Sequence, residues 1–67
     1  MKKIENYDGS VTYRIEYGDI RVQQTLSRYT LETFKKIFKD DLYELKIHSD
    51  LLRKYVELLY EKRRLSN

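Results

Sequence analysis

The chain has 67 residues, 40% of them hydrophobic, and 14 Lys and Arg against 11 Asp and Glu give it a formal net charge of +3. This length predicts one small domain over residues 1–67, and the lack of Cys together with a single His excludes a disulfide framework and a Cys-based zinc site. Charged residues make up 37% of the chain, but seven Tyr and two Phe among many aliphatic residues are too many for a disordered protein. We therefore expect a folded domain.

The N-terminal residues do not resemble a targeting segment. Glu5, Asn6 and Asp8 stand where a secretion signal requires an apolar run of about 7–15 residues. Apolar runs elsewhere fall far short of the roughly 20 residues that span a bilayer. We expect a cytoplasmic protein without a membrane segment. Its composition, rich in Lys, Ile and Tyr and without Ala, resembles that of small phage or mobile-element proteins from A+T-rich genomes.

Residues 11–26 have the pattern of a β-hairpin. Apolar and polar side chains alternate from Val11 to Tyr17, Gly18-Asp19 follows, and the alternation resumes at Ile20. Because Gly suits the first position of a two-residue type II′ turn, the hairpin pairs Tyr17 with Ile20 and every earlier residue in step. One face of this hairpin is almost wholly apolar.

A second turn, Asp8-Gly9, fits a two-residue type I′ loop and adds a strand over residues 2–7. This register sets Ile4 opposite Tyr13 on the apolar face. The pairing is less favourable elsewhere, since Lys3 then lies opposite Arg14. The sheet is therefore predicted as a meander of two or three strands.

A first helix is predicted to begin at Thr30 as N-cap. Apolar residues from Phe34 to Leu45 recur at helical spacing over an arc of roughly 140°. Tyr43 lies outside this arc, which indicates either an exposed aromatic residue or a break near Asp40-Asp41. A strand over residues 42–48 is the alternative, because apolar and polar residues also alternate there, and we rank it below the helix.

A final helix is predicted from a cap at Ser49 or Asp50 to about Leu65, with cations in its last turn. Its apolar residues cover roughly 220° of the circumference, whereas a helix packed on a core needs only a little over about 100°. The excess predicts two packing surfaces. The second could be covered by the first helix or by a second subunit.

The predicted fold is α+β, a small antiparallel meander followed by two α-helices packed on one face. The expected core consists of Tyr13, Ile15, Tyr17, Ile20, Val22, Leu26, Phe34, Ile37, Phe38, Leu45, Leu52, Tyr55, Val56 and Leu59.

The residues give little support to catalysis. His48 is the only His, and it precedes a predicted cap, where an exposed or capping role explains it. Asp40, Asp41 and Glu44 are explained as helix-capping acids and lack the spacing of a calcium loop. Both glycines serve turns, which leaves none for a phosphate-binding loop. We expect a non-enzymatic protein with no catalytic residue, metal site, cofactor or small-molecule substrate.

The leading expectation is a small protein that binds another protein stoichiometrically, in the manner of a phage inhibitor of a larger host or defence protein, and that forms a homodimer. Tyr and surplus apolar side chains are typical of binding hot spots. The candidate partner-binding residues are Tyr7, Tyr29, Tyr43, Leu51, Leu58 and Tyr60.

The alternative is DNA binding by the polar face of the sheet, where Arg and Gln could address base edges. Its candidate residues are Thr12, Arg14, Arg21, Gln23 and Thr25. The order of two strands and a helix, from Asp8-Gly9-Ser10 to Thr30-Leu31-Glu32, resembles the arm-binding domains of tyrosine integrases. This resemblance covers about half the chain, includes no diagnostic motif, and implies a DNA partner.

Overall fold

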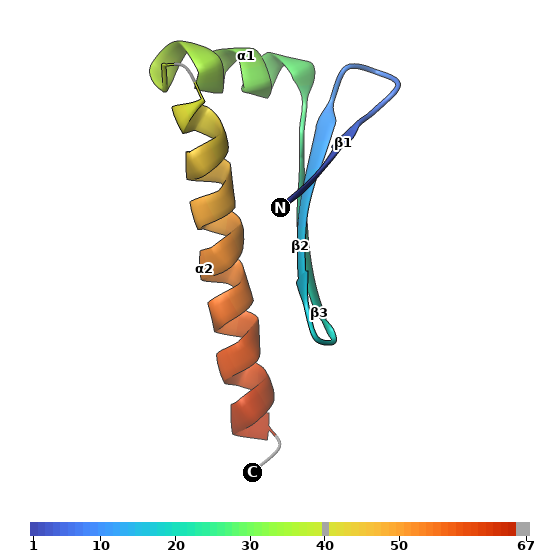
Figure 1. Cartoon of the computed structure of the whole chain (residues 1–67), viewed down its shortest axis with the longest axis vertical. Coiled ribbons are helices and arrows are strands. Elements are labelled where there is room, and N and C mark those ends of the chain that lie inside the picture. Colours follow the sequence, from blue (N-terminus) through green and yellow to red (C-terminus); the bar gives the residue numbers. More distant parts are fainter. Residues whose placement is uncertain (40, 66–67) are drawn as a thin grey trace.

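The computed structural model describes residues 1–39 and 41–65. Strands β1 (Lys2–Glu5), β2 (Val11–Tyr17) and β3 (Ile20–Leu26) form one antiparallel sheet in the order β1-β2-β3, and helices α1 (Arg28–Ile37) and α2 (Leu42–Leu65) follow. The long helix α2 runs beside the sheet, while α1 crosses one end of the molecule and joins the two (Figure 1). The predicted α+β meander followed by two helices is confirmed, and it has three strands.

The β2–β3 hairpin has the register that the sequence predicts. Tyr17 pairs with Ile20 and Ile15 with Val22, and the ladder continues to the pair of Val11 and Leu26. Gly18 has a φ of +63°, a backbone conformation that costs little only for glycine. The turn residue and the alternating pattern therefore specify the same pairing.

The register of β1 differs from the predicted one by a single residue. Ile4 pairs with Thr12, and Lys3 pairs with Tyr13. The loop holds three residues, since the Asn6 amide donates to the Ser10 carbonyl oxygen at 2.8 Å and Gly9, at φ +89°, closes the turn. A shift of one residue exchanges the two faces of a strand, so Lys3 lies on the helix side and Ile4 on the outer side.

Helix α1 begins at Arg28, earlier than predicted. Ser27 is its N-cap, and its hydroxyl oxygen accepts a hydrogen bond from the Thr30 amide at 3.1 Å. The prediction of Thr30 as the cap was wrong because Ser27 occupies the same kind of position three residues earlier. The helix ends at Ile37, where the Phe38 amide donates to the Phe34 carbonyl oxygen at 2.8 Å.

The helical structure is interrupted between Ile37 and Leu42, which agrees with the break considered near Asp40-Asp41. Asp40 itself lies outside the described residues. Helix α2 is then continuous over 24 residues. Residues 42–48 are therefore helical, as ranked first. Ser49 and Asp50 lie inside this helix, so the prediction that one of them caps a separate helix was wrong.

The core lies between the helix-facing side of the sheet and one side of α2. Its buried apolar residues are Val11, Tyr13, Ile15, Val22, Leu26, Leu31, Tyr43, Ile47 and Leu51. Ile20, Phe34, Phe38, Tyr55 and Leu58 pack against them and are partly buried. All of the predicted core residues of β2 and β3 contribute to this core except Tyr17, which is half exposed beside Tyr55 near the hairpin turn.

The predicted core residues in the helices are mostly wrong. Ile37, Leu45, Leu52 and Val56 are exposed, and Leu59 is only half-buried. The break at residues 38–41 resets the helical phase, so the spacing from Phe34 to Leu45 does not describe one continuous face. Helix α2 then packs on the sheet with the face that holds Tyr43, Ile47 and Leu51.

Candidate protein-binding surface

The molecule is thin and elongated, which leaves much of α2 uncovered. Its extents are 44 × 24 × 15 Å and its radius of gyration is 13.8 Å. A compact domain of this length has a radius of gyration of about 11 Å. The 24 residues of α2 form a helix about 36 Å long, so α2 accounts for most of the long axis. The molecule is one sheet and one long helix thick, and the far side of α2 faces solvent (Figure 1).

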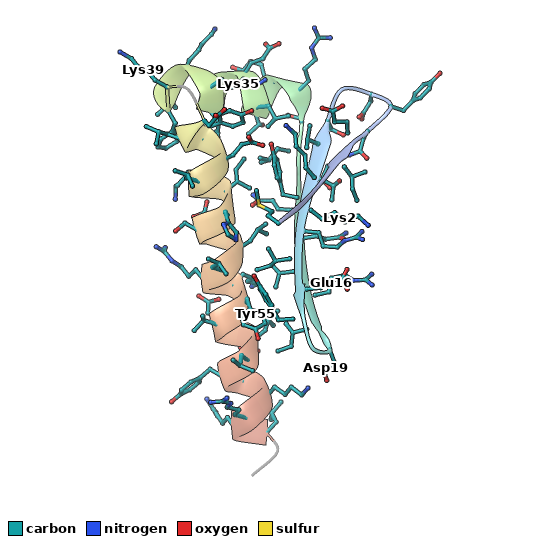
Figure 2. The ribbon with its side chains drawn as sticks, in the orientation of Figure 1. Lys2, Glu16, Asp19, Lys35, Lys39 and Tyr55 are labelled. Atoms are coloured by element: carbon teal, nitrogen blue, oxygen red, sulfur yellow. The ribbon has the colours of Figure 1, made fainter. Side chains whose placement is uncertain are left out.

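Helix α2 has two apolar faces. The inner face packs on the sheet through Tyr43, Ile47 and Leu51, and Tyr55 extends it toward the hairpin (Figure 2). The other face, called the outer stripe here, consists of Leu42, Leu45, Leu52, Val56 and Leu59.

Most of the outer stripe is open to solvent. Leu42, Leu45 and Val56 expose 54%, 62% and 59% of their surface, and Leu52 exposes 37%. Tyr60, at 72% exposure, lies next to the stripe one turn after Val56. An exposed apolar patch of this kind often marks an interaction site.

Glu44 holds α2 on the sheet and so fixes the direction in which the outer stripe points. The Tyr13 hydroxyl donates to Oε2 of Glu44 at 3.1 Å, and Nζ of Lys3 lies 3.3 Å from the same oxygen. Burial, and then the nearby Glu44 charge, raise the pKa of the Tyr13 hydroxyl; the hydrogen bond to Glu44 also raises the pKa of Lys3. Glu44 therefore bonds across to the sheet, and its prediction as a capping acid was wrong.

A second polar contact joins the far end of α2 to the sheet. Lys62, in the last turn, pairs with Asp19 of the β2–β3 turn, which is labelled at the end of the hairpin in Figure 2. This contact lowers the pKa of the Asp19 carboxyl group, chiefly through its hydrogen bond with Lys62. Helix α2 is thus attached to the sheet near both of its ends.

The six predicted partner-binding residues do not form one surface. Tyr7, Tyr29 and Tyr60 are exposed, at 108%, 80% and 72%, but they lie on the β1–β2 loop, on the first turn of α1 and on the second half of α2. Tyr43 and Leu51 are buried at 8% and 2%, and Leu58 packs against the core. The second apolar side of α2 that the excess arc predicted is present, and of the six candidate residues only Tyr60 lies beside it.

The predicted nucleic-acid face is the outer side of the sheet, and its side chains bond largely to one another. Nε of Arg14 donates to Oε1 of Gln23 at 3.1 Å, and the hydroxyl oxygens of Thr12 and Thr25 are 2.8 Å apart. Glu16 lies on the same face, 3.4 Å from Nε of Arg21. The structure thus brings the five residues together as predicted, but an acid shares their surface and Thr12 is buried.

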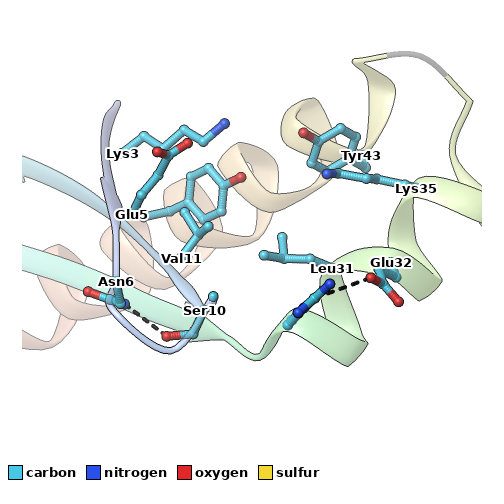
Figure 3. A pocket seen from close by; sticks show the side chains of 12 residues that line it. Lys3, Glu5, Asn6, Ser10, Val11, Leu31, Glu32, Lys35 and Tyr43 are labelled. Carbon is cyan, nitrogen blue, oxygen red and sulfur yellow. Dashed lines mark hydrogen bonds and ion pairs between the residues drawn. The ribbon is translucent and has the colours of Figure 1, made fainter.

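A cavity of about 390 Å³ lies between the β1–β2 loop, α1 and the start of α2 (Figure 3). Cations and acids alternate around it, and the Arg28 side chain pairs with Glu32 at 3.5 Å. Nζ of Lys35 lies 5.5 Å from the centroid of the Tyr43 ring. The lining has no consistent charge and points to no particular ligand.

His48 lies in the first third of α2 and is half-buried, so its prediction as an exposed or capping residue was wrong. Its Nε2 atom is buried without a hydrogen-bond partner among the described residues. Within residues 1–39 and 41–65, no group of three or more His, Cys, Asp and Glu is placed to hold a metal ion. In the same part of the chain, neither helix combines the length and the apolar character that crossing a bilayer requires.

Comparison of the chain with protein-family models, with curated proteins and with solved structures finds no match.

Proposed function

We propose that this chain is a non-enzymatic protein-binding module and that the outer stripe of α2 is its binding surface. One observation carries the proposal: a 24-residue helix packs on the sheet with one apolar face and exposes a second apolar face to solvent. Covering apolar surface is the main favourable contribution to protein association, at about 25 cal/mol per Å² before the costs of binding are counted.

The geometry of the stripe supports a protein partner. Leu45, Leu52 and Val56 follow one side of a rigid helix that is attached to the sheet near both ends. A preorganised helix face of this kind binds with little loss of conformational entropy. An apolar helix face fits a helix or a groove of another protein, which supplies the matching apolar surface.

The compositional resemblance to small phage proteins extends the proposal to its biological context. In that context, the module acts stoichiometrically in the cytoplasm and modulates or inhibits a larger host or defence protein by covering part of its surface.

The proposal is tested by affinity capture from cells of the source organism, with and without nuclease. Val56→Glu places a charge on the outer stripe at a position that is 59% exposed, so the fold should persist. Lys54→Gln makes the same change in charge at an exposed position of α2 outside the stripe. We expect nuclease-resistant retention of a protein by the wild type and by Lys54→Gln, and its loss from Val56→Glu.

Two outcomes would contradict the proposal. Equal retention by all three proteins would show that the outer stripe is not the binding surface. Retention that disappears with nuclease, and a mobility shift of DNA that salt weakens steeply, would instead favour the outer face of the sheet and the alternative function.

A further inference from the structure

We propose that the outer stripe binds a second copy of this chain, with the two α2 helices packed antiparallel about a two-fold axis. The inference rests on the proposed function, because it names the occupant of the same surface.

The spacing of the stripe is that of a two-helix seam. Leu42, Leu45, Leu52, Val56 and Leu59 are separated by three, seven, four and three residues, so they occupy the two apolar positions of a heptad repeat. The repeat continues through the polar positions Ser49 and Arg63. A straight helix that keeps this repeat over three heptads presents a narrow, nearly continuous seam to another helix.

A second copy supplies a matching seam. In a two-fold interface the same patch lies on both sides, so it must be complementary to itself. Near the middle of the stripe, Leu52 and Val56 face the same two apolar residues when two copies meet.

The distribution of charge along α2 sets the direction of pairing. Lys62, Arg63 and Arg64 occupy the last turn, whereas Glu44 lies in the first turn and Asp41 directly precedes the helix. A parallel pair would bring the cations of both copies together at one end. An antiparallel pair separates these cations and opposes the two helix dipoles, which is the favourable arrangement.

A register follows if the two-fold axis is level with Lys54. Leu52 of one copy then lies opposite Val56 of the other, Ser49 lies opposite Leu59, and Leu45 lies opposite Arg63. Leu65 of one copy then lies level with Tyr43 of the other. The second helix therefore ends near the level at which α1 crosses the end of the molecule (Figure 1).

The area available suits a reversible dimer. At the fractions given above, the outer stripe with Tyr60 exposes on the order of 500 Å² of side-chain surface on each copy. A standard interface buries about 800 Å² on each partner, and weak or transient ones bury less than about 600 Å². With the polar residues that flank the seam, the area buried on each copy stays in the range of weak interfaces, so we expect association in the micromolar range.

Sedimentation equilibrium from about 5 to about 500 µM tests the occupant, since this range brackets a micromolar dissociation constant. We expect a concentration-dependent dimer for the wild type and for Lys54→Gln, and at least a tenfold weaker dimer for Val56→Glu and for Leu52→Glu. Far-ultraviolet circular dichroism checks that each variant is folded. A wild type that stays monomeric, or folded stripe variants that dimerise as well as the wild type, would overturn the inference.

Distances between nitroxide labels test the direction of pairing, because the chain has no Cys of its own. In the antiparallel pair, labels on Arg53→Cys are offset along the helix axis by about 3 Å, and labels on Lys46→Cys, at the same heptad position, by about 24 Å. We expect a clearly longer distance for the second pair. Equal distances would indicate a parallel pair and overturn the arrangement.

The fate of the proposed function can be read separately. A monomeric wild type that still captures another protein through the outer stripe would overturn only the second-copy occupant. A monomeric wild type whose capture does not depend on Val56 would overturn both.

Discussion

At the scale of single residues, Glu44 contributes most clearly to the position of the binding surface. Its carboxylate accepts the hydrogen bond of Tyr13, a side chain with no exposed surface, and it pairs with Lys3 from β1. The register shift of β1 makes this contact possible, because in the predicted register Lys3 would point away from the helices. One residue in the loop therefore decides whether the sheet can bond to α2.

We expect Glu44→Ala to lower the free energy of unfolding by about 1–2 kcal/mol, because it leaves the Tyr13 hydroxyl buried without an acceptor. Lys3→Ala is the control, and it should cost less than about 0.5 kcal/mol since Lys3 is well exposed. Urea denaturation measures both. A double-mutant cycle with Tyr13→Phe should show coupling, and strictly additive losses would contradict the role of this hydrogen bond.

Asp8 makes the stability of the β1–β2 loop depend on pH. Hydrogen bonds from the Ser10 hydroxyl and amide hold the pKa of the Asp8 carboxyl group below its ordinary value of 3.8. A carboxyl group with a lowered pKa in the folded state stabilises the fold above the unfolded pKa, and the effect is lost as the pH falls through the folded pKa.

Asp8→Asn resembles the protonated side chain at every pH. We therefore expect the wild type to have the higher urea midpoint at pH 7 and the difference to shrink as the pH falls below about 4. Denaturation series at several pH values measure it. A difference that stays constant down to pH 2 would show that the charge of Asp8 does not contribute.

At the scale of elements, the hairpin was predictable and the helix faces were not. The alternation of β2 and β3 and the glycine of their turn specify a single register. The first loop was harder, since Asp8-Gly9 suits both a two-residue turn and the last positions of the three-residue loop that forms. The two loops differ by one residue, and that residue decides which side chains of β1 face α2.

The inner face of α2 could not be deduced from periodicity. Helix α2 is apolar on two sides, so the spacing of its apolar residues is compatible with packing on the sheet through Ile47 and Leu51 or through Leu52 and Val56. The break at residues 38–41 sets which side meets the sheet, and nothing in the local pattern fixes how far the chain rotates there. Four residues of the outer stripe, Leu45, Leu52, Val56 and Leu59, were consequently predicted as core, and the buried Tyr43 as a binding residue.

The cap of α1 can be tested against the predicted one. We expect Ser27→Ala to cost about 1 kcal/mol of unfolding free energy, because it removes the acceptor for the Thr30 amide. Thr30→Ala should cost only a few tenths, since the Thr30 side chain bonds to the cap hydroxyl and not to a free helix amide. Chemical denaturation of the two variants compares them, and a larger loss for Thr30→Ala would restore the predicted cap.

At the scale of the whole molecule, the core is small because only one of the two apolar faces of the long helix α2 packs on the sheet. Nine buried apolar residues stabilise a chain that is longer and thinner than a compact domain of this length. A second copy on the outer stripe would turn two thin layers into four, with a second apolar interface between the helices. Helix α2 would then contribute apolar surface both to the folding of the chain and to its association.

The change of backbone amide chemical shifts over a dilution series tests most directly whether the outer stripe is the binding surface and a second copy occupies it. We expect the amides of α2 around Leu45, Leu52 and Val56 to move with concentration, while those around Arg14 and Gln23 on the outer face of the sheet stay fixed. Shifts that move on the sheet and not along α2, or that do not move at all, would contradict it.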